Sequence, residues 1–308
     1  MNKLLKFNRL IALGCSFAIS CIQFVYAKDS TLKANFDLES GVEYDSKLTV
    51  VELDQLKEEA DIALKFAAKA KFNWQATQKL TVKGGYTYSN KDYKMYDEFD
   101  LIIHQLSAEA NYDFSVIKLG ALHYLSKAEL AGEDFLNLNQ SSLFLSKLMD
   151  NKHYLRFSIN FTDKKLDDFS SRNSIGKGYS ADYFLFENQA KSFFSISIHT
   201  DKQSADSTQF NYYEQGINTK MSHQFDRFSL PQKIQLSVSY WHRDYTEITP
   251  LIGRKRDDKK QGAELSWFIN LNEYITLHNK LEYADYHSNL NTADYHEYLA
   301  SIQVKAAF

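Results

Sequence analysis

Cysteine and proline are both scarce in this sequence, and most of it has no long apolar run. Of 308 residues only 2 are cysteine and 2 are proline, and both cysteines, Cys15 and Cys21, lie near the N-terminus. The rest of the chain therefore has no disulfide framework, and no Pro- or Gly-rich linker divides it into domains. After residue 28, no stretch approaches the roughly 20 apolar residues that a membrane-spanning helix needs. The formal net charge of -3 gives no indication of nucleic-acid binding.

The N-terminal segment has the pattern of a cleaved secretory signal peptide. A basic start is followed by a mostly apolar run over residues 10–24, and then by Val-Tyr-Ala at 25–27, where small residues stand at the positions that a signal peptidase reads. We therefore predict a signal peptide over residues 1–27. The mature chain then covers residues 28–308 and begins at Lys28.

A lipid anchor is the alternative for this segment, since it holds both cysteines. Neither follows a typical lipidation motif, because Ala12 and Ala18 stand where a leucine is usual. Cleavage after residue 27 leaves a mature chain without cysteine, which fits an oxidising compartment.

The organising pattern of the remaining chain is an alternation of apolar and polar residues with a period of two. It is clearest over residues 60–74, where every second residue from Ala60 to Trp74 is apolar and residues such as Lys65 and Lys69 stand between them. An Ala-rich helix is the alternative. In a helix, residues two apart point about 200° apart, which would scatter the apolar set around the axis. A strand places the whole set on one face.

The same alternation predicts 14 strands in all. Seven segments are clear: 32–44, 60–74, 80–88, 155–161, 234–240, 275–283 and 298–308. Seven are less regular: 98–112, 116–126, 138–148, 179–188, 192–201, 210–225 and 261–270.

The gaps between these segments alternate in length. Short gaps lie near 76–78, 113–115, 150–151, 188–190 and 271–272, with a somewhat longer one around Pro231. Long gaps lie near 45–58, 89–97, 127–137, 163–178, 202–209, 245–259 and 287–294. This is the layout of a closed antiparallel transmembrane β-barrel in the bacterial outer membrane, with short periplasmic turns and longer extracellular loops. An even strand count places both chain ends on the periplasmic side.

Aromatic residues on the outward face agree with this orientation. We expect a periplasmic girdle that contains Phe72, Trp74, Trp267 and Phe308, and an outer girdle that contains Tyr44, Tyr88, Tyr240, Tyr283 and Tyr298. A water-soluble sandwich also alternates, but it has no reason to order its gaps and aromatic residues in this way. A terminal aromatic such as Phe308 also resembles the signal that the barrel-insertion machinery reads.

Inward-facing charges are the candidate functional residues of the lumen. They are Asp37, Glu39, Lys65, Lys69, Lys71 and Lys83 on the first three strands. One interpretation is a cross-strand ladder of opposite charges, each pair contributing about 0.2–1 kcal/mol. This interpretation is favoured, because the charges nearly balance. The other is a charged lumen that guides a solute.

The most charged stretch of the chain is residues 254–260, where a long gap meets the twelfth strand. It supplies three candidates for a loop or gate: Arg254, Arg256 and Asp257. A solvated loop is one interpretation. Contact with lipopolysaccharide phosphates, or a gate that faces the lumen, are the others.

Catalytic and metal sites receive little support. His242 and Asp244 share a face near Asp257 and Asp258, and an Asp–His pair can activate water, but the sequence does not bring them together in space. Asp285, His287, Asp294 and His296 offer metal ligands at a loop mouth. There is no Gly-rich phosphate loop and no nucleophile elbow. We therefore expect no enzyme, no cofactor and no metal.

The last 55 or so residues resemble the barrel of the surface lipoprotein assembly modifier family. The matching features are Gly253-Arg254-Lys255-Arg256-Asp257, two strands, Tyr283, Ser288-Asn289 and the terminal Phe308. The resemblance implies a 14-stranded barrel that helps to move lipoproteins or other polymers across the outer membrane. The N-terminal helical-repeat domain usual in that family is not seen in this sequence.

Together these patterns predict an outer-membrane barrel that acts in transport, either as a pore or in the export of a substrate. The alternatives are a structural or adhesive surface barrel that acts through its loops, and an outer-membrane hydrolase. The expected partners are outer-membrane lipid and lipopolysaccharide, the insertion machinery and an exported substrate.

Overall fold

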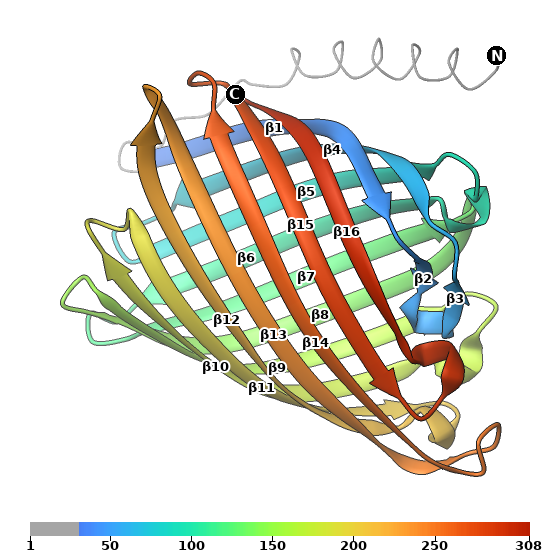
Figure 1. Cartoon of the computed structure of the whole chain (residues 1–308). Helices are drawn as coiled ribbons and strands as arrows, with labels where there is room; N and C mark the ends of the chain where they lie inside the picture. The colour runs from blue at the N-terminus through green and yellow to red at the C-terminus, as the bar shows by residue number, and fades with distance from the viewer. Residues whose placement is uncertain (1–30) are drawn as a thin grey trace.

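The computed structural model describes residues 31–308, and the predicted signal peptide and the Lys28 start lie outside them. The described chain forms one closed antiparallel sheet of 14 strands (Figure 1), as the alternation predicts. β1 hydrogen-bonds to β4 on one side and to β16 on the other, which closes the ring. No helix in this part of the chain is long and apolar enough to span a membrane.

The barrel strands follow one another around the ring in chain order, and every neighbouring pair is antiparallel. They are β1 (Thr31–Asp45), β4 (Asp61–Gln75), β5 (Leu80–Tyr93), β6 (Leu101–Asp113), β7 (Lys118–Leu130), β8 (Glu133–Met149), β9 (His153–Leu166), β10 (Ser174–Glu187), β11 (Ser192–Ala205), β12 (Tyr212–Arg227), β13 (Leu230–Thr249), β14 (Arg254–Asn270), β15 (Ile275–Ser288) and β16 (Tyr295–Ala307). Two short strands, β2 (Leu48–Val50) and β3 (Gln55–Lys57), form a separate hairpin.

Side chains alternate between the outer face and the lumen along each strand. On β4, Leu64 is 56% exposed on the outside, whereas its neighbour Lys65 points inward and contacts Glu43 of β1. The predicted aromatic girdles also lie outside: Trp74 and Trp267 are exposed toward one rim, and Tyr44 and Tyr298 toward the other. The outer face is therefore apolar and the inner face polar, as a barrel in lipid requires.

The two rims differ in their connections. At the rim that holds the C-terminus the turns have 2 to 4 residues, and at the opposite rim the connections reach 15 residues, between β1 and β4. The predicted long gap at 127–137 is wrong. β7 and β8 run through it and meet in a tight turn at Ala131 and Gly132, whose φ values of 54° and 84° suit a hairpin with the twist of the strands.

The strands at the long-connection rim are longer than predicted because polar residues there are compatible with pairing. A strand that extends above the lipid is wet on both faces, so its polarity no longer distinguishes it from a loop. The ion pair of 2.7 Å between Lys127 Nζ and Asp134 Oδ1 lies in such a polar extension. The run 254–260 is likewise the start of β14 and not a loop.

The connection 46–60 is the exception, because it folds inward. It carries the β2–β3 hairpin, with a 3-10 turn (η1, Val51–Leu53) at its tip. Leu48 is fully buried and belongs to an apolar cluster with Val50, Tyr93, Phe99 and Leu166. Burying these side chains against the inner wall holds the hairpin inside the mouth of the barrel.

The facing assignment is tested by Leu64→Arg and its neighbour Lys65→Gln. An arginine facing the middle of the bilayer costs about 2–4 kcal/mol. We therefore expect Leu64→Arg to lower the free energy of unfolding, measured by denaturant titration of the barrel in vesicles, by that amount. Lys65→Gln should change it little, since Glu43 keeps Lys91 at 2.9 Å. A larger loss in Lys65→Gln than in Leu64→Arg would invert the assignment.

Candidate functional site

The predicted lumen charges form a ladder across the first strands. Asp37, Glu39 and Glu43 of β1 face lysines of β4, with carboxylate-to-Nζ distances of 3.8 Å to Lys71, 3.3 Å to Lys69 and 2.7 Å to Lys65. Lys83 of β5 reaches Glu109 of β6 at 2.9 Å.

The ladder continues on the other side of β1. Lys305 of β16 lies 3.2 Å from Asp37, and His278 of β15 lies 3.2 Å from Glu39. Every lumen candidate thus lies in the barrel wall beside an opposite charge, which is the arrangement of a cross-strand ladder. A role in guiding a solute stays a prediction.

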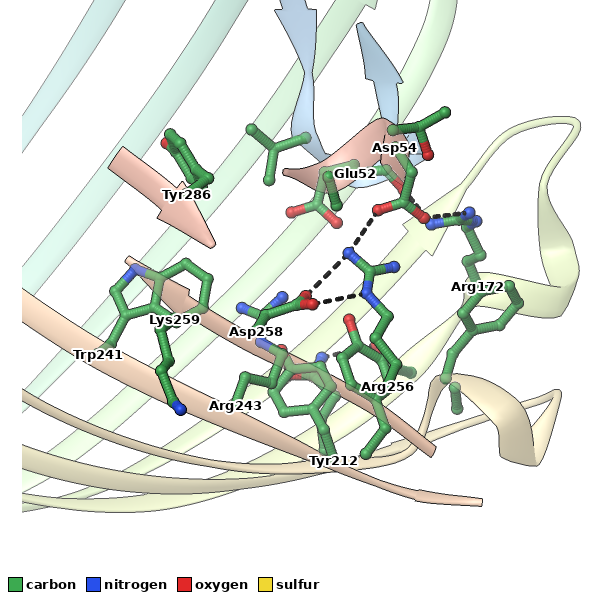
Figure 2. A pocket seen from close by; sticks show the side chains of 18 of the residues that line it. Glu52, Asp54, Arg172, Tyr212, Trp241, Arg243, Arg256, Asp258, Lys259 and Tyr286 are labelled. Atoms are coloured by element: carbon green, nitrogen blue, oxygen red, sulfur yellow. Dashed lines mark hydrogen bonds and ion pairs between the residues drawn. The ribbon is translucent and has the colours of Figure 1, made fainter. Parts of the chain in front are cut away.

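A second group of charges joins the inward hairpin to the far wall (Figure 2), and of its members only Arg256 was a candidate from the sequence. Glu52 accepts a hydrogen bond of 2.6 Å from Lys164 of β9. Asp54 lies between Arg172 and Arg256, at 2.7 Å and 2.8 Å. Because these basic residues come from β9, the 167–173 connection and β14, the hairpin is tied across the mouth rather than to its own strands. We call Glu52, Asp54, Lys164, Arg172 and Arg256 the hairpin anchor.

Arg256 is the central cation of the hairpin anchor. Only 6% of the residue is exposed, and it contacts Asp258 at 2.8 Å as well as Asp54. Its guanidinium also lies 4.9 Å from the ring centroid of Tyr245. A planar guanidinium satisfies several acceptors at once, which a lysine cannot do in the same geometry.

Asp54 is held in the ionised state. Burial raises the pKa of its carboxyl, but the hydrogen bonds and charges of Arg256 and Arg172 outweigh the burial and bring the pKa below the ordinary value. Its φ of 55° lies in the left-handed region, which aspartate tolerates better than most residues.

Aromatic side chains surround the anchor and narrow the mouth further. Arg243 of β13 lies 4.1 Å from the ring centroid of Tyr212 and donates two hydrogen bonds, of 3.0 Å and 2.7 Å, to Glu214. The other aromatic residues that line this pocket are Phe210, Trp241, Tyr245, Tyr286 and Tyr295. The result is a mouth built of paired charges and aromatic faces.

The three gate candidates separate in the structure. Arg256 enters the hairpin anchor, whereas Arg254 is exposed at the first position of β14. Asp257 points to the outer face, opposite to its neighbours Arg256 and Asp258, because successive residues of a strand alternate. Of the three, only Arg256 therefore lies inside the lumen, and its role as a gate stays a prediction.

On the outer face, Asp257 meets the histidine considered for catalysis. His242 Nε2 lies 2.7 Å from Asp257 and 3.3 Å from Asp244, and one ligand atom from each lies within 4.8 Å of the others. Asp258, which the sequence groups with them, faces the lumen. Of the second candidate set, His287 and Asp294 meet at 3.1 Å.

Phe308 lies beside the seam where the barrel closes. Its backbone N–H donates to Phe36 at 2.8 Å and its carbonyl accepts from Phe36 at 3.1 Å. The side chain is exposed on the outer face. Its role as an assembly signal stays a prediction.

A closed barrel with an apolar outside, two aromatic girdles and a polar, charged inside belongs to the class of bacterial outer-membrane β-barrels. Solved structures of this class are similar to the chain. The trimer form of OmpT, an outer membrane protein of Vibrio cholerae, is similar with a TM-score of 0.54 and 6% identity, over 91% of this chain and 100% of that one. An anion-selective porin from Comamonas acidovorans is similar with a TM-score of 0.50 and 8% identity, over 91% of this chain and 100% of that one.

At this identity the likeness shows the fold alone. No family model and no curated protein matches the sequence. The particular resemblance to surface lipoprotein assembly modifiers is therefore not supported by these comparisons, whereas the barrel is.

Acidification should release the hairpin. Since the pKa of Asp54 is lower when it is anchored than when the hairpin is free, protons favour the free hairpin. The contribution of Asp54 is complete above the ordinary aspartate pKa of about 3.9 and is lost as the pH falls through the lower, anchored value. An environment-sensitive fluorophore on Gln55→Cys, an exposed position on the hairpin, should report this change.

Two variants separate Asp54 from the other groups of the anchor. Asp54→Asn should shift the fluorescence toward the acid form already at neutral pH and flatten the profile. Glu52→Gln removes the other carboxylate of the hairpin anchor and should keep the acid transition. An unchanged profile in Asp54→Asn would show that Asp54 does not hold the hairpin.

Proposed function

We propose that this barrel is a channel for hydrophilic solutes across the outer membrane, and that the hairpin over residues 46–60 sets its width. The observation that carries the proposal is the pairing of a polar lumen with an inward hairpin tied to the opposite wall. Barrels of 8 strands are filled by side chains and those of 16 to 18 leave an aqueous channel, so about 14 strands leave a passage that a hairpin can control.

The wall of β10 to β14 supports a passage on one side of the lumen. Several of its inward positions are small, although charged and aromatic residues stand between them. The small residues are Gly176, Gly178, Ser180, Ser195, Ser197, Gly216, Ser237, Ser239 and Gly262. The opposite wall carries the long side chains of the ladder, and above them the apolar cluster of the hairpin. A solute would therefore meet hydroxyl and backbone groups as well as charged side chains along this wall, with the hairpin anchor at the mouth.

A structural barrel that acts through its outer surface would have no need of this anchor. Its connections at the long-connection rim, apart from 46–60, have only 2 to 7 residues, which offers little surface for adhesion. Outer-membrane lipid and lipopolysaccharide remain the expected surroundings of the apolar outer face.

A more specific alternative to a solute channel is that the barrel assists the export of a polymer. This alternative rests on the resemblance of the last strands to surface lipoprotein assembly modifiers. The structure places Arg256, one of the matching residues, in the hairpin anchor, and Asn289 beside Asp257 and Lys255, to which it is hydrogen-bonded. Both functions use the lumen, but export of a large substrate requires the hairpin to leave it.

Planar-bilayer recording of the purified barrel tests the proposal. We expect discrete conductance steps in the natural chain. Replacing residues 47–58 by a short polar linker should increase the conductance, because it removes the hairpin together with Glu52 and Asp54. The double variant Lys127→Gln/Asp134→Asn, which breaks an ion pair in the β7–β8 hairpin, should leave the conductance unchanged.

Absence of conductance in both the natural and the shortened barrel would contradict the channel. Conductance only in the shortened barrel would instead favour a closed barrel that opens for a substrate.

A further inference from the structure

The short-turn end of the lumen contains lysines of which only Lys305 takes part in the ladder. A cavity of about 400 Å³ opens there, lined by Lys191, Lys233, Lys305, Asp226, Phe268 and Thr276 among others. Three lysines thus face one aspartate in this cavity. By the alternation of their strands, Lys233, Lys305 and Thr276 all point into the lumen.

Lys233 is the central residue of this group. Its Nζ lies 4.2 Å from the ring centroid of Phe268, which in turn stacks on His278 at 4.2 Å. Among residues 31–308, neither Lys233 nor Lys220 has a carboxylate oxygen within 4.0 Å of its Nζ. Lys220 does not line the cavity, but it faces the lumen from the adjacent strand β12, four residues along from Gln224, the register partner of Lys233.

Nearby carboxylates do not balance this group. Asp37 is shared between Lys305 and Lys71, and Glu39 between Lys69 and His278. In the sheet register Lys220 lies opposite Ser195 and Ser237, and Lys233 lies opposite Gln224 and Phe268, so neither has an acidic cross-strand partner and the group has an excess of positive charge to offer to an anion. Lysine ammonium groups are suited to phosphate and carboxylate oxygens as point charges.

We propose that Lys220, Lys233 and Lys305 form a binding site for a small multivalent oxyanion at the periplasmic end of the lumen, and that the channel therefore prefers anions. This inference rests on the proposed channel function for its transport consequence, but the site itself does not require conduction. A positively charged ring inside walls of low dielectric concentrates anions, as rings of lysine and arginine do in anion pores.

The test uses Lys220→Gln/Lys233→Gln, with Lys177→Gln/Lys202→Gln as the matched control. The control removes the same number of positive charges from the outer face of β10 and β11, where Lys177 and Lys202 lie opposite each other and are exposed. Two measurements are made on each folded barrel in detergent or bilayer. One is equilibrium binding of pyrophosphate by calorimetry, and the other is the reversal potential in a potassium chloride gradient.

We expect the natural barrel to bind pyrophosphate and to prefer chloride over potassium. The lumen variant should bind pyrophosphate about tenfold more weakly and shift the reversal potential toward potassium, whereas the control should change neither. Lys233→Arg keeps the charge and should restore most of the binding lost in Lys233→Gln, which separates a charge effect from a loss of folding.

The outcomes distinguish the site from the channel. If no barrel conducts but the lumen variant alone loses pyrophosphate binding, the site stands and the channel function fails. If the barrels conduct and the lumen variant matches the control in both measurements, the channel stands and the oxyanion site is overturned. Failure of the natural barrel to bind pyrophosphate also overturns the site.

Discussion

The structure depends above all on the closure of the backbone hydrogen-bond ring. Lipid offers no partner to an N–H or C=O group, so a sheet that crosses a membrane must have no free edge. Here the seam between β1 and β16 extends from Asp45 to the reciprocal hydrogen bonds of Phe36 and Phe308. Closure then determines which way the side chains point. Because each strand is paired on both sides, each side chain faces either the lipid or the lumen, and every charged residue near the middle of a strand must face the lumen.

Charged residues that face the lumen stabilise the barrel mainly by forming ion pairs with one another. Glu43, with 2% of its side chain exposed, contacts both Lys65 and Lys91, and Asp54 contacts both Arg172 and Arg256. A buried ion left without its partner is costly, so these groups constrain each other's position. The ladder on β1 and β4 holds adjacent strands together, whereas the hairpin anchor crosses the lumen and holds parts of the wall that are far apart in the sequence.

The sequence allows the barrel to be predicted because each strand contains its own signal. Alternation over residues 60–74 depends only on those residues, and the ladder between Asp37 and Lys71 follows from two neighbouring strands. Strand ends are harder to predict, as the wrong gap at 127–137 shows, because the polarity constraint ends where the strand leaves the lipid.

The hairpin anchor could not be predicted in the same way. Asp54 and Arg256 are brought together only by the closed ring, and no local pattern links them. One signal was available: the apolar residues Leu48, Val50, Val51 and Leu53 stand in a connection that should be polar, and exposed apolar side chains there would be unfavourable unless they were buried. The same limit applies to Lys220 and Lys233, whose lack of a carboxylate partner becomes visible only when the side chains are placed.

The two ends of the lumen therefore use charge differently. At the long-connection rim, arginines and carboxylates form ion pairs around Asp54 and Arg256, and these ion pairs hold the hairpin in position. At the short-turn rim, Lys233 and Lys220 lack such partners, and their field acts on whatever enters. An ion pair cancels most of its own field beyond a few ångströms, whereas an unpaired lysine does not. The selectivity of the proposed channel would therefore depend on the unpaired residues, and the ladder lysines Lys65 and Lys69 would contribute mainly to the wall.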